Sequence, residues 1–405
     1  MMKKEEFLEL RQNLMEQLEI APELEDEEIL GMIDELVLEK GRRAALSLKE
    51  KVRLRQELFY SVRKLDVLQE LLEDEQVTEI MVNGPEKIFV ERNGRITKWE
   101  QTFSSREKLE DVIQQIVGKC NRSVNEAMPI ADARLRSGER VNVVLPPIAL
   151  DGPILTIRRF PKEPVTMKRL VKWGSLTEEC AEFLEKLVQA RYSMVIGGGT
   201  GSGKTTFLGA LAGCIPEEER IITIEDNAEL QLWSLPNLVR LEARQATLGG
   251  NVGISIRDLI RTALRMRPSR IIVGEVRGGE LFDALTAFNS GHTGSLLTAH
   301  ANSTKDMLSR LETMVLMGVE IPLDAIRRQI ASGIDIFIHL GRMSDGSRKL
   351  LEIAEVLGYE QGEIKLQTLY VRRGQELLCV NSLMHRENLE RAGIEYEKSD
   401  PYKEK

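Results

Sequence analysis

The sequence predicts an α/β protein: a mostly parallel sheet toward the C-terminus, a smaller α+β domain before it, and an all-helical N-terminal extension. Apolar residues recur at helical spacing up to about residue 73, hairpin turns follow, and helices alternate with apolar strands farther on. We expect the helical extension over 1–73, the α+β domain over 74–160, a linker over 161–176, and the α/β domain over 177–405, which ends in a subdomain of helices and strands.

The helical extension is amphipathic and acidic. Leu54, Leu58, Val62 and Leu65 recur three or four residues apart between charged neighbours. Residues 1–75 contain 12 Lys and Arg against 20 Asp and Glu, which accounts for the whole net charge of −8. This acidity favours a solvated helical bundle over a helix that lies on a membrane surface.

Turn signals mark the α+β domain. Asn83-Gly84 and Asn93-Gly94 separate short runs of strand-forming residues, as expected for hairpins. A helix is predicted over 106–119, because five apolar residues fall on one of its faces. The predicted strands are 79–82, 87–91, 95–97, 140–144 and 154–159.

Composition excludes several classes of protein. Of the 405 residues, 42% are hydrophobic, yet no stretch approaches the roughly 20 apolar residues that span a bilayer. The N-terminal residues lack the apolar core of a secretory signal, so we expect a cytoplasmic protein. The cysteines lack the spacing of a metal site and are expected to be reduced, packed thiols: Cys120, Cys180, Cys214 and Cys379.

A glycine-rich turn follows the predicted strand 193–196. Residues 198–205, Gly-Gly-Thr-Gly-Ser-Gly-Lys-Thr, match the Walker A pattern between a strand and a helix. Its glycines let backbone amides turn toward phosphate oxygens, Lys204 supplies a charge, and Thr205 offers a hydroxyl to Mg²⁺. We therefore expect ATP and Mg²⁺ as ligands. The predicted nucleotide-binding residues are Gly198, Gly199, Thr200, Gly201, Ser202, Gly203, Lys204, Thr205 and Thr206.

Acidic residues end two other predicted strands. Glu275 ends the run 270–275, and Glu225 with Asp226 ends the run that starts at Ile221. Carboxylates at the ends of buried strands can hold the shell of a metal ion or orient a water, although either could instead cap the next helix. His300 ends a further apolar strand, where it could sense a γ-phosphate or simply be a packed residue.

Four segments in a fixed order resemble a known family. They are 198–205, 223–226, 271–277 and 291–300, which are similar to the Walker A, Asp box, Walker B and His box of the type II and type IV secretion ATPase superfamily. The resemblance covers about residues 60–370 and is closest to the tight-adherence (Flp) pilus branch, named CpaF or TadA. The phrases shared with that branch are 80–84, 140–144, 263–268 and 300–302.

The resemblance implies an architecture and partners. It implies a RecA-like C-terminal domain after a PAS-like α+β domain, in a homohexamer whose two domains hold ATP between them. It also implies force transmission to an inner-membrane platform protein, with the chain on the cytoplasmic face of that membrane. The charge balance of the chain, in turn, predicts no direct contact with nucleic acid.

The resemblance also implies roles for individual residues. Glu275 would polarise the attacking water, assisted by Glu225 and Asp226. Because Gly274 stands where many P-loop proteins have aspartate, Mg²⁺ would depend on Thr205 and on Glu275 acting through water. Arginines of the α+β domain would reach the phosphates and others would stabilise charge, although each is also compatible with a surface role. They are Arg134, Arg140, Arg158, Arg240 and Arg244.

The leading hypothesis is therefore an ATP-hydrolysing motor for pilus assembly or protein secretion. A RecA-type DNA or RNA translocase or helicase would share the fold. Against it stand the net charge of −8 and an aromatic content of 5%, which leave little for base stacking. A nucleotide-dependent regulatory scaffold with negligible hydrolysis is a third hypothesis.

Overall fold

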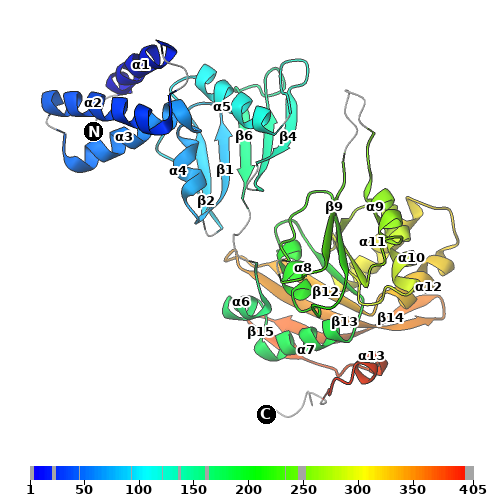
Figure 1. Cartoon of the computed structure of the whole chain (residues 1–405). Helices are drawn as coiled ribbons and strands as arrows, with labels where there is room; N and C mark the ends of the chain where they lie inside the picture. The colour runs from blue at the N-terminus through cyan, green and yellow to red at the C-terminus, as the bar shows by residue number, and fades with distance from the viewer. Residues whose placement is uncertain are drawn as a thin grey trace. The chain divides into compact units, whose positions relative to one another are not determined.

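The computed structural model describes residues 4–20, 24–44, 46–92, 94–120, 122–135, 138–159, 164–232, 234–244 and 252–396. The chain divides into two compact units, Met1–Pro161 and Lys162–Lys405 (Figure 1). Residues 161–163 of the predicted linker lie outside the described residues. In the described part of the chain, no helix is both long and apolar enough for a membrane crossing.

Three helices begin unit 1 and share a small core of their own. They are α1 (Lys4–Ile20), α2 (Asp26–Ala44) and α3 (Leu48–Arg63). Leu14, Ile33 and Leu58 are fully buried where these helices meet. A capping box fixes the start of α3, because Ser47 and Glu50 each bond to the other's backbone N–H.

An antiparallel six-stranded sheet forms the rest of unit 1, in the order β3-β2-β1-β6-β5-β4. The predicted helix 106–119 is confirmed as α5, and its apolar face is buried in the core of this unit. Strand β4 was not predicted. The elements are α4 (Leu68–Glu73), β1 (Val77–Asn83), β2 (Ile88–Arg92), β3 (Arg95–Lys98), α5 (Arg106–Lys119), β4 (Ile130–Arg134), β5 (Arg140–Val144) and β6 (Ile154–Arg158).

Unit 2 contains a nine-stranded sheet in the order β15-β14-β13-β12-β7-β11-β10-β8-β9. The strands from β12 to β9 in this order are parallel, as the sequence predicts, whereas β13, β14 and β15 extend the same sheet with antiparallel pairing. The strands are β7 (Met194–Gly198), β8 (Ile221–Glu225), β9 (Leu238–Glu242), β10 (Arg270–Val276), β11 (Leu296–Ala299), β12 (Ile336–Arg342), β13 (Arg348–Glu360), β14 (Glu363–Arg373) and β15 (Glu376–Cys379).

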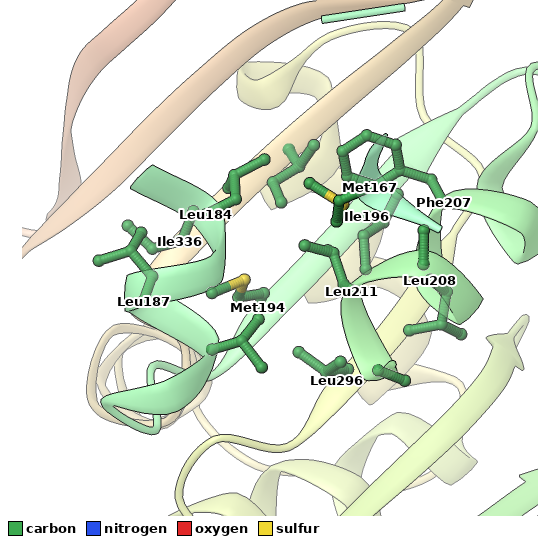
Figure 2. Packing of buried hydrophobic residues seen from close by; sticks show 14 of the residues in the cluster. Met167, Leu184, Leu187, Met194, Ile196, Phe207, Leu208, Leu211, Leu296 and Ile336 are labelled. Atoms are coloured by element: carbon green, nitrogen blue, oxygen red, sulfur yellow. The ribbon is translucent and has the colours of Figure 1, made fainter. Parts of the chain in front are cut away.

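Helices cover both faces of this sheet, so its central strands are apolar throughout rather than alternating. One face carries α6 (Met167–Lys172), α7 (Glu178–Gln189), α8 (Lys204–Ala212) and α13 (Glu387–Arg391). The other carries α9 (Ile256–Ala263), α10 (Glu280–Asn289), α11 (Thr304–Leu316) and α12 (Leu323–Gly333). Figure 2 shows side chains of α7 and α8 packed on Met194 and Ile196 of β7, which fixes the strand before the glycine-rich turn.

The predicted linker, 161–176, contains the short helix α6. Thr166 caps its N-terminus by accepting a hydrogen bond from Arg169 N, and Met167 and Leu170 are buried in the core of unit 2. These two apolar residues are three positions apart, so they lie on one face of α6, and this part of the predicted linker packs into unit 2. The chain is therefore anchored in unit 2 from α6 onward.

A buried ion pair joins segments at the end of the sheet where β10 begins. Arg270 is fully buried, and its Nε and Nη2 donate to the two carboxylate oxygens of Glu219 at 2.8 and 2.5 Å. Its Nη1 also donates to Val188 O at 2.6 Å. Burial alone would raise the pKa of Glu219, but the hydrogen bonds and charge of Arg270 lower it.

Candidate active site

The glycine-rich turn and the predicted acidic and histidine residues lie at the same edge of the unit 2 sheet. Strands β7, β11, β10 and β8 are neighbours and parallel, so their carboxyl ends meet there. Four features therefore converge there: the turn after β7, His300 after β11, Glu275 in β10 and Glu225 at the end of β8. Along the chain, Gly198 and His300 are 102 positions apart.

The turn itself has the backbone of a phosphate-binding loop. Gly201 and Gly203 adopt φ angles of 72° and 91°, which side-chain-bearing residues rarely tolerate. A Cβ on Gly198 would lie 2.5 Å from Ser202 Oγ and 2.6 Å from Leu340 O, so only glycine fits. The N-cap residue of α8, Gly203, has no side chain that could bond to the N–H groups of the first turn, and these groups can therefore bind an anion.

Lys204 is buried and points back toward this loop. Its Nζ donates to Gly198 O at 3.1 Å and to Gly199 O at 3.2 Å, and it lies 3.5 Å from His300 Nδ1. Burial lowers the pKa of Lys204, and the nearby Glu275 charge partly offsets this effect. Thr205 is half-buried and Thr206 is exposed at the start of α8.

A line of polar contacts runs from Lys204 across the strand ends. His300 Nε2 lies 2.6 Å from Glu275 Oε1, and Glu275 Oε2 accepts a hydrogen bond from Arg277 Nη2 at 2.7 Å. Arg277 Nη1 lies 3.9 Å from Asp226 Oδ2. The structure thus brings together Lys204, His300, Glu275 and Asp226 of the predicted set, with Arg277 as a connecting residue.

His300 lies between a positive and a negative group. Burial and, next, the charge of Lys204 lower the pKa of His300, and the charge of Glu275 partly offsets these effects. Its Nε2 faces Glu275 Oε1 and its Nδ1 faces the ammonium group of Lys204. His300 therefore lies between the phosphate-loop lysine and the Glu275 carboxylate.

Glu225 is buried and binds the loop that follows β8. It is 2% exposed, and its Oε2 accepts hydrogen bonds from the backbone N–H groups of Glu229 at 2.7 Å and Leu230 at 3.0 Å. Burial raises its pKa to about 7, partly offset by those two N–H groups. Its Oε1 has no hydrogen-bond partner among the described residues, which is costly for a buried oxygen.

Gly274 explains how Glu225 fits. A Cβ at Gly274 would lie 2.8 Å from Glu225 Cγ, because β10 and β8 are paired neighbours. An aspartate at this position would collide with the buried glutamate. The glycine where many P-loop proteins have aspartate thus follows from the packing of Glu225.

The other predicted arginines occupy separate places. Arg240 lies exposed on β9, and its charge acts on Glu225, whose pKa it lowers. Arg244 is exposed just beyond β9, and its Nη2 donates to Val252 O at 3.0 Å. No contact of Arg244 with the phosphate loop occurs among the described residues.

The three arginines of unit 1 form a row of their own. Arg134 pairs with Arg140 in register, Arg140 pairs with Arg158, and Arg158 pairs with Glu79. Their side chains lie on the sheet face opposite the α5 core, because alternate residues of these strands are the buried ones. The row thus places three positive charges and the Glu79 carboxylate on one face of the sheet.

Sequence reasoning gave no role to two arginines of this edge. Arg277 follows Glu275 by two residues, directly after the end of β10, and this spacing could have indicated their contact. Arg348 Nε donates to Gly201 O at 3.0 Å from a strand 147 residues away, and no local pattern signals such a contact.

The residues present fit a nucleotide and a magnesium ion. The glycine cradle excludes a Cβ and presents backbone donors, as phosphate oxygens require. Hydroxyl and carboxylate oxygens are ligands that Mg²⁺ prefers, and Thr205 and Glu275 supply them at this edge. Glu225 Oε1, which is buried and has no hydrogen-bond partner in the described part of the chain, is a further oxygen at this sheet edge.

Comparisons with known proteins agree with this geometry. The family described as "Type II/IV secretion system protein" matches residues 62–377. The type IV secretion system protein PtlH of Bordetella pertussis is 33% identical over 70% of this chain and 91% of its own. VirB11 of Brucella suis is 33% identical over 68% of this chain and 84% of its own.

A solved structure shares the fold. The pilus retraction motor PilT with bound ADP aligns with a TM-score of 0.52 and 20% identity, over 81% of this chain and 86% of its own. At this identity the similarity concerns the fold alone, a mixed α/β arrangement with sheets.

The pKa of Glu225 predicts a pH dependence of stability. Burial raises this pKa from 4.5 to about 7, so the folded chain binds a proton that the unfolded chain releases. The unfolding free energy should therefore fall as pH rises from about 4.5 to above 7, by up to about 3 kcal/mol from this group. The glutamine in Glu225→Gln cannot ionise, so this variant should lose this part of the dependence of the unfolding free energy on pH.

Urea unfolding at pH 5 and pH 8 measures the effect. The change in unfolding free energy between the two pH values should be smaller for Glu225→Gln than for the wild type. Glu376→Gln, an exposed control on β15, should behave as the wild type. If the unfolding free energy of Glu225→Gln changed with pH as much as that of the wild type, the raised pKa of Glu225 would be contradicted.

Proposed function

Since this chain belongs to the type II/IV secretion system protein family and is an ATPase, we propose that it is a motor whose ATP hydrolysis powers pilus assembly or protein secretion. The observation that carries the proposal is the convergence of Lys204, His300 and Glu275 beside a glycine cradle. The contacts of 3.5 Å and 2.6 Å through His300 connect the phosphate side of the site to a carboxylate.

Hydrolysis requires an in-line attack of water on the γ-phosphorus, breakage of the bond to the β-γ bridging oxygen, and release of ADP and phosphate. In our proposal Glu275 orients this water and accepts its proton, while Lys204 and the loop amides stabilise charge on the phosphate oxygens. His300 and Arg277 position the Glu275 carboxylate from both sides. Mg²⁺, held by Thr205 and through water by Glu275, would supply neutralisation of phosphate charge.

Glu225 has a supporting role in this scheme. Its carboxylate fixes the backbone of the loop that carries Asp226, through Glu229 N and Leu230 N. Asp226 in turn faces Arg277. The geometry therefore favours Glu275 over Glu225 as the residue that acts on the water.

We further propose that the α/β domain 177–405 of unit 2 is RecA-like and that the α+β domain 74–160 of unit 1 is PAS-like. The parallel strand order around the phosphate loop supports the first assignment, and the antiparallel sheet with α5 on one face supports the second. We propose a homohexamer in which the row of Arg134, Arg140 and Arg158 contributes positive charge to bound ATP. Arg240 and Arg244 are proposed to stabilise charge within the ring.

The proposed partner is an inner-membrane platform protein of a tight-adherence or related pilus or secretion system, contacted from the cytoplasmic side. The secretion-system names of relatives support this location. Cell fractionation with and without the platform protein tests it. Membrane retention that persists in cells lacking the partner would contradict docking through that protein.

Removal of the loop lysine tests the nucleotide site. Lys204→Ala should lower steady-state ATP hydrolysis by about 100-fold or more, because it removes a positive charge beside the developing phosphate charge. Lys365→Ala, at a lysine of β14 paired with Glu363, is the matched control and should retain activity. Phosphate release measures both.

Normal hydrolysis by Lys204→Ala would refute this site. Negligible hydrolysis by the wild type with Mg²⁺ would instead favour the regulatory scaffold. Strong stimulation of the wild type by single-stranded DNA would favour a translocase.

The arginine row generates a second test. Replacement of Arg134, Arg140 and Arg158 together by alanine should lower kcat by about 10- to 100-fold, because each charge stabilises the transition state only weakly but the group acts together. Lys98→Ala on β3 is the control on the same sheet. A triple variant with wild-type kcat would contradict the role of the arginine row.

Sedimentation of the wild type with Mg²⁺ and a nucleotide analogue tests the oligomeric state and should show a hexamer. A strict monomer would contradict the proposed homohexamer.

A further inference from the structure

Arg348 holds the phosphate loop from outside its own motif. Its Nε donates to Gly201 O at 3.0 Å, and its side chain lies along Gly203, where a Cβ would be 3.2 Å from Arg348 Cδ. Within the motif, Lys204 and Ser202 also donate to loop carbonyls. Arg348 thus connects the loop to β13, a strand that does not pair with β7.

The backbone of β13 beside Arg348 is bonded to the turn after α6. Ser175 Oγ donates to Arg348 O at 2.8 Å, and Leu350 N donates to Ser175 O at 2.9 Å. Lys349 Nζ donates to Gly174 O at 2.7 Å. Hydrogen bonds from side chains and from the backbone thus connect residues 173–175 to residues 348–350.

A second strand strengthens this connection. Arg372 of β14 donates from Nη2 to Ser175 O at 3.0 Å and from Nε to Leu350 O at 2.7 Å. Ser175 and Leu350 are buried, so these bonds are shielded from competing water. The backbone of Arg348 is therefore bonded to a buried network at Ser175, and its side chain reaches from there to Gly201.

The turn at 173–175 follows α6, the first helix of unit 2 after the chain leaves unit 1. We propose that Arg348 is a positioning residue for ATP hydrolysis, which shapes the phosphate loop through Gly201 and transmits nucleotide occupancy to the turn at 173–175. This inference rests on the proposed nucleotide site but on no particular partner. Such coupling is reciprocal, so tension on the α6 turn would also alter the affinity of the loop for nucleotide.

Hydrogen–deuterium exchange of the full-length chain tests the coupling, with AMP-PNP and Mg²⁺ as the probe. In the wild type, the nucleotide should slow exchange in the phosphate loop and also, by about 3- to 10-fold, at the amides of Ser175 and Leu350. In Arg348→Met the loop should still be protected, but the effect at Ser175 and Leu350 should be lost. Arg373→Met, at an exposed arginine of β14, should behave as the wild type.

Kinetics give an independent readout. Loss of a charged hydrogen bond to the loop should raise the KM for ATP of Arg348→Met by about 5- to 10-fold, with a smaller change in kcat. Arg348→Lys, which keeps the charge, should recover part of this loss. Because Arg348 is exposed, the melting temperature should change little, which separates positioning from misfolding.

The outcomes are distinguishable. Nucleotide protection at Ser175 and Leu350 that persists in Arg348→Met, together with a wild-type KM, would overturn the inference alone. Failure of AMP-PNP to protect the phosphate loop of the wild type would overturn the proposed nucleotide site and this inference with it.

Discussion

The site depends on one constraint, the adjacency of the parallel strands β7, β11, β10 and β8. Their shared direction brings the glycine loop, His300, Glu275 and Glu225 to one edge, and burial on both sheet faces holds the strands there. Packing of α7 and α8 on β7 fixes the strand that precedes the loop (Figure 2). The core thus holds in place the strand ends from which the functional residues extend.

The same constraint explains the unusual features of the edge. A glutamate buried at the end of β8 requires the neighbouring strand to leave room, and Gly274 does so at the position directly before Glu275. The buried Glu225 binds backbone N–H groups and keeps a raised pKa, which fits a residue that supports the loop. The more accessible Glu275 contacts His300 and Arg277 and is the carboxylate that we propose acts on the water.

Sequence patterns indicated the parts whose signal is local. The amphipathic helix at 106–119 and the glycine loop between a strand and a helix follow from spacing and composition, and the structure has both. Strand β4 was missed because it lies at a sheet edge and buries only Ala131, which leaves almost no alternation. The contact of Arg348 with Gly201 depends on sheet order and could not be predicted from neighbours in sequence.

The central claim is that Glu275, positioned by His300 and Arg277, acts on the attacking water while Glu225 supports the loop. Single-turnover hydrolysis of pre-bound ATP by Glu275→Gln tests it most directly. The account predicts nucleotide affinity within a few-fold of the wild type and a hydrolysis step slower by about 100-fold or more. A wild-type hydrolysis step in Glu275→Gln, together with a lost step in Glu225→Gln, would contradict it.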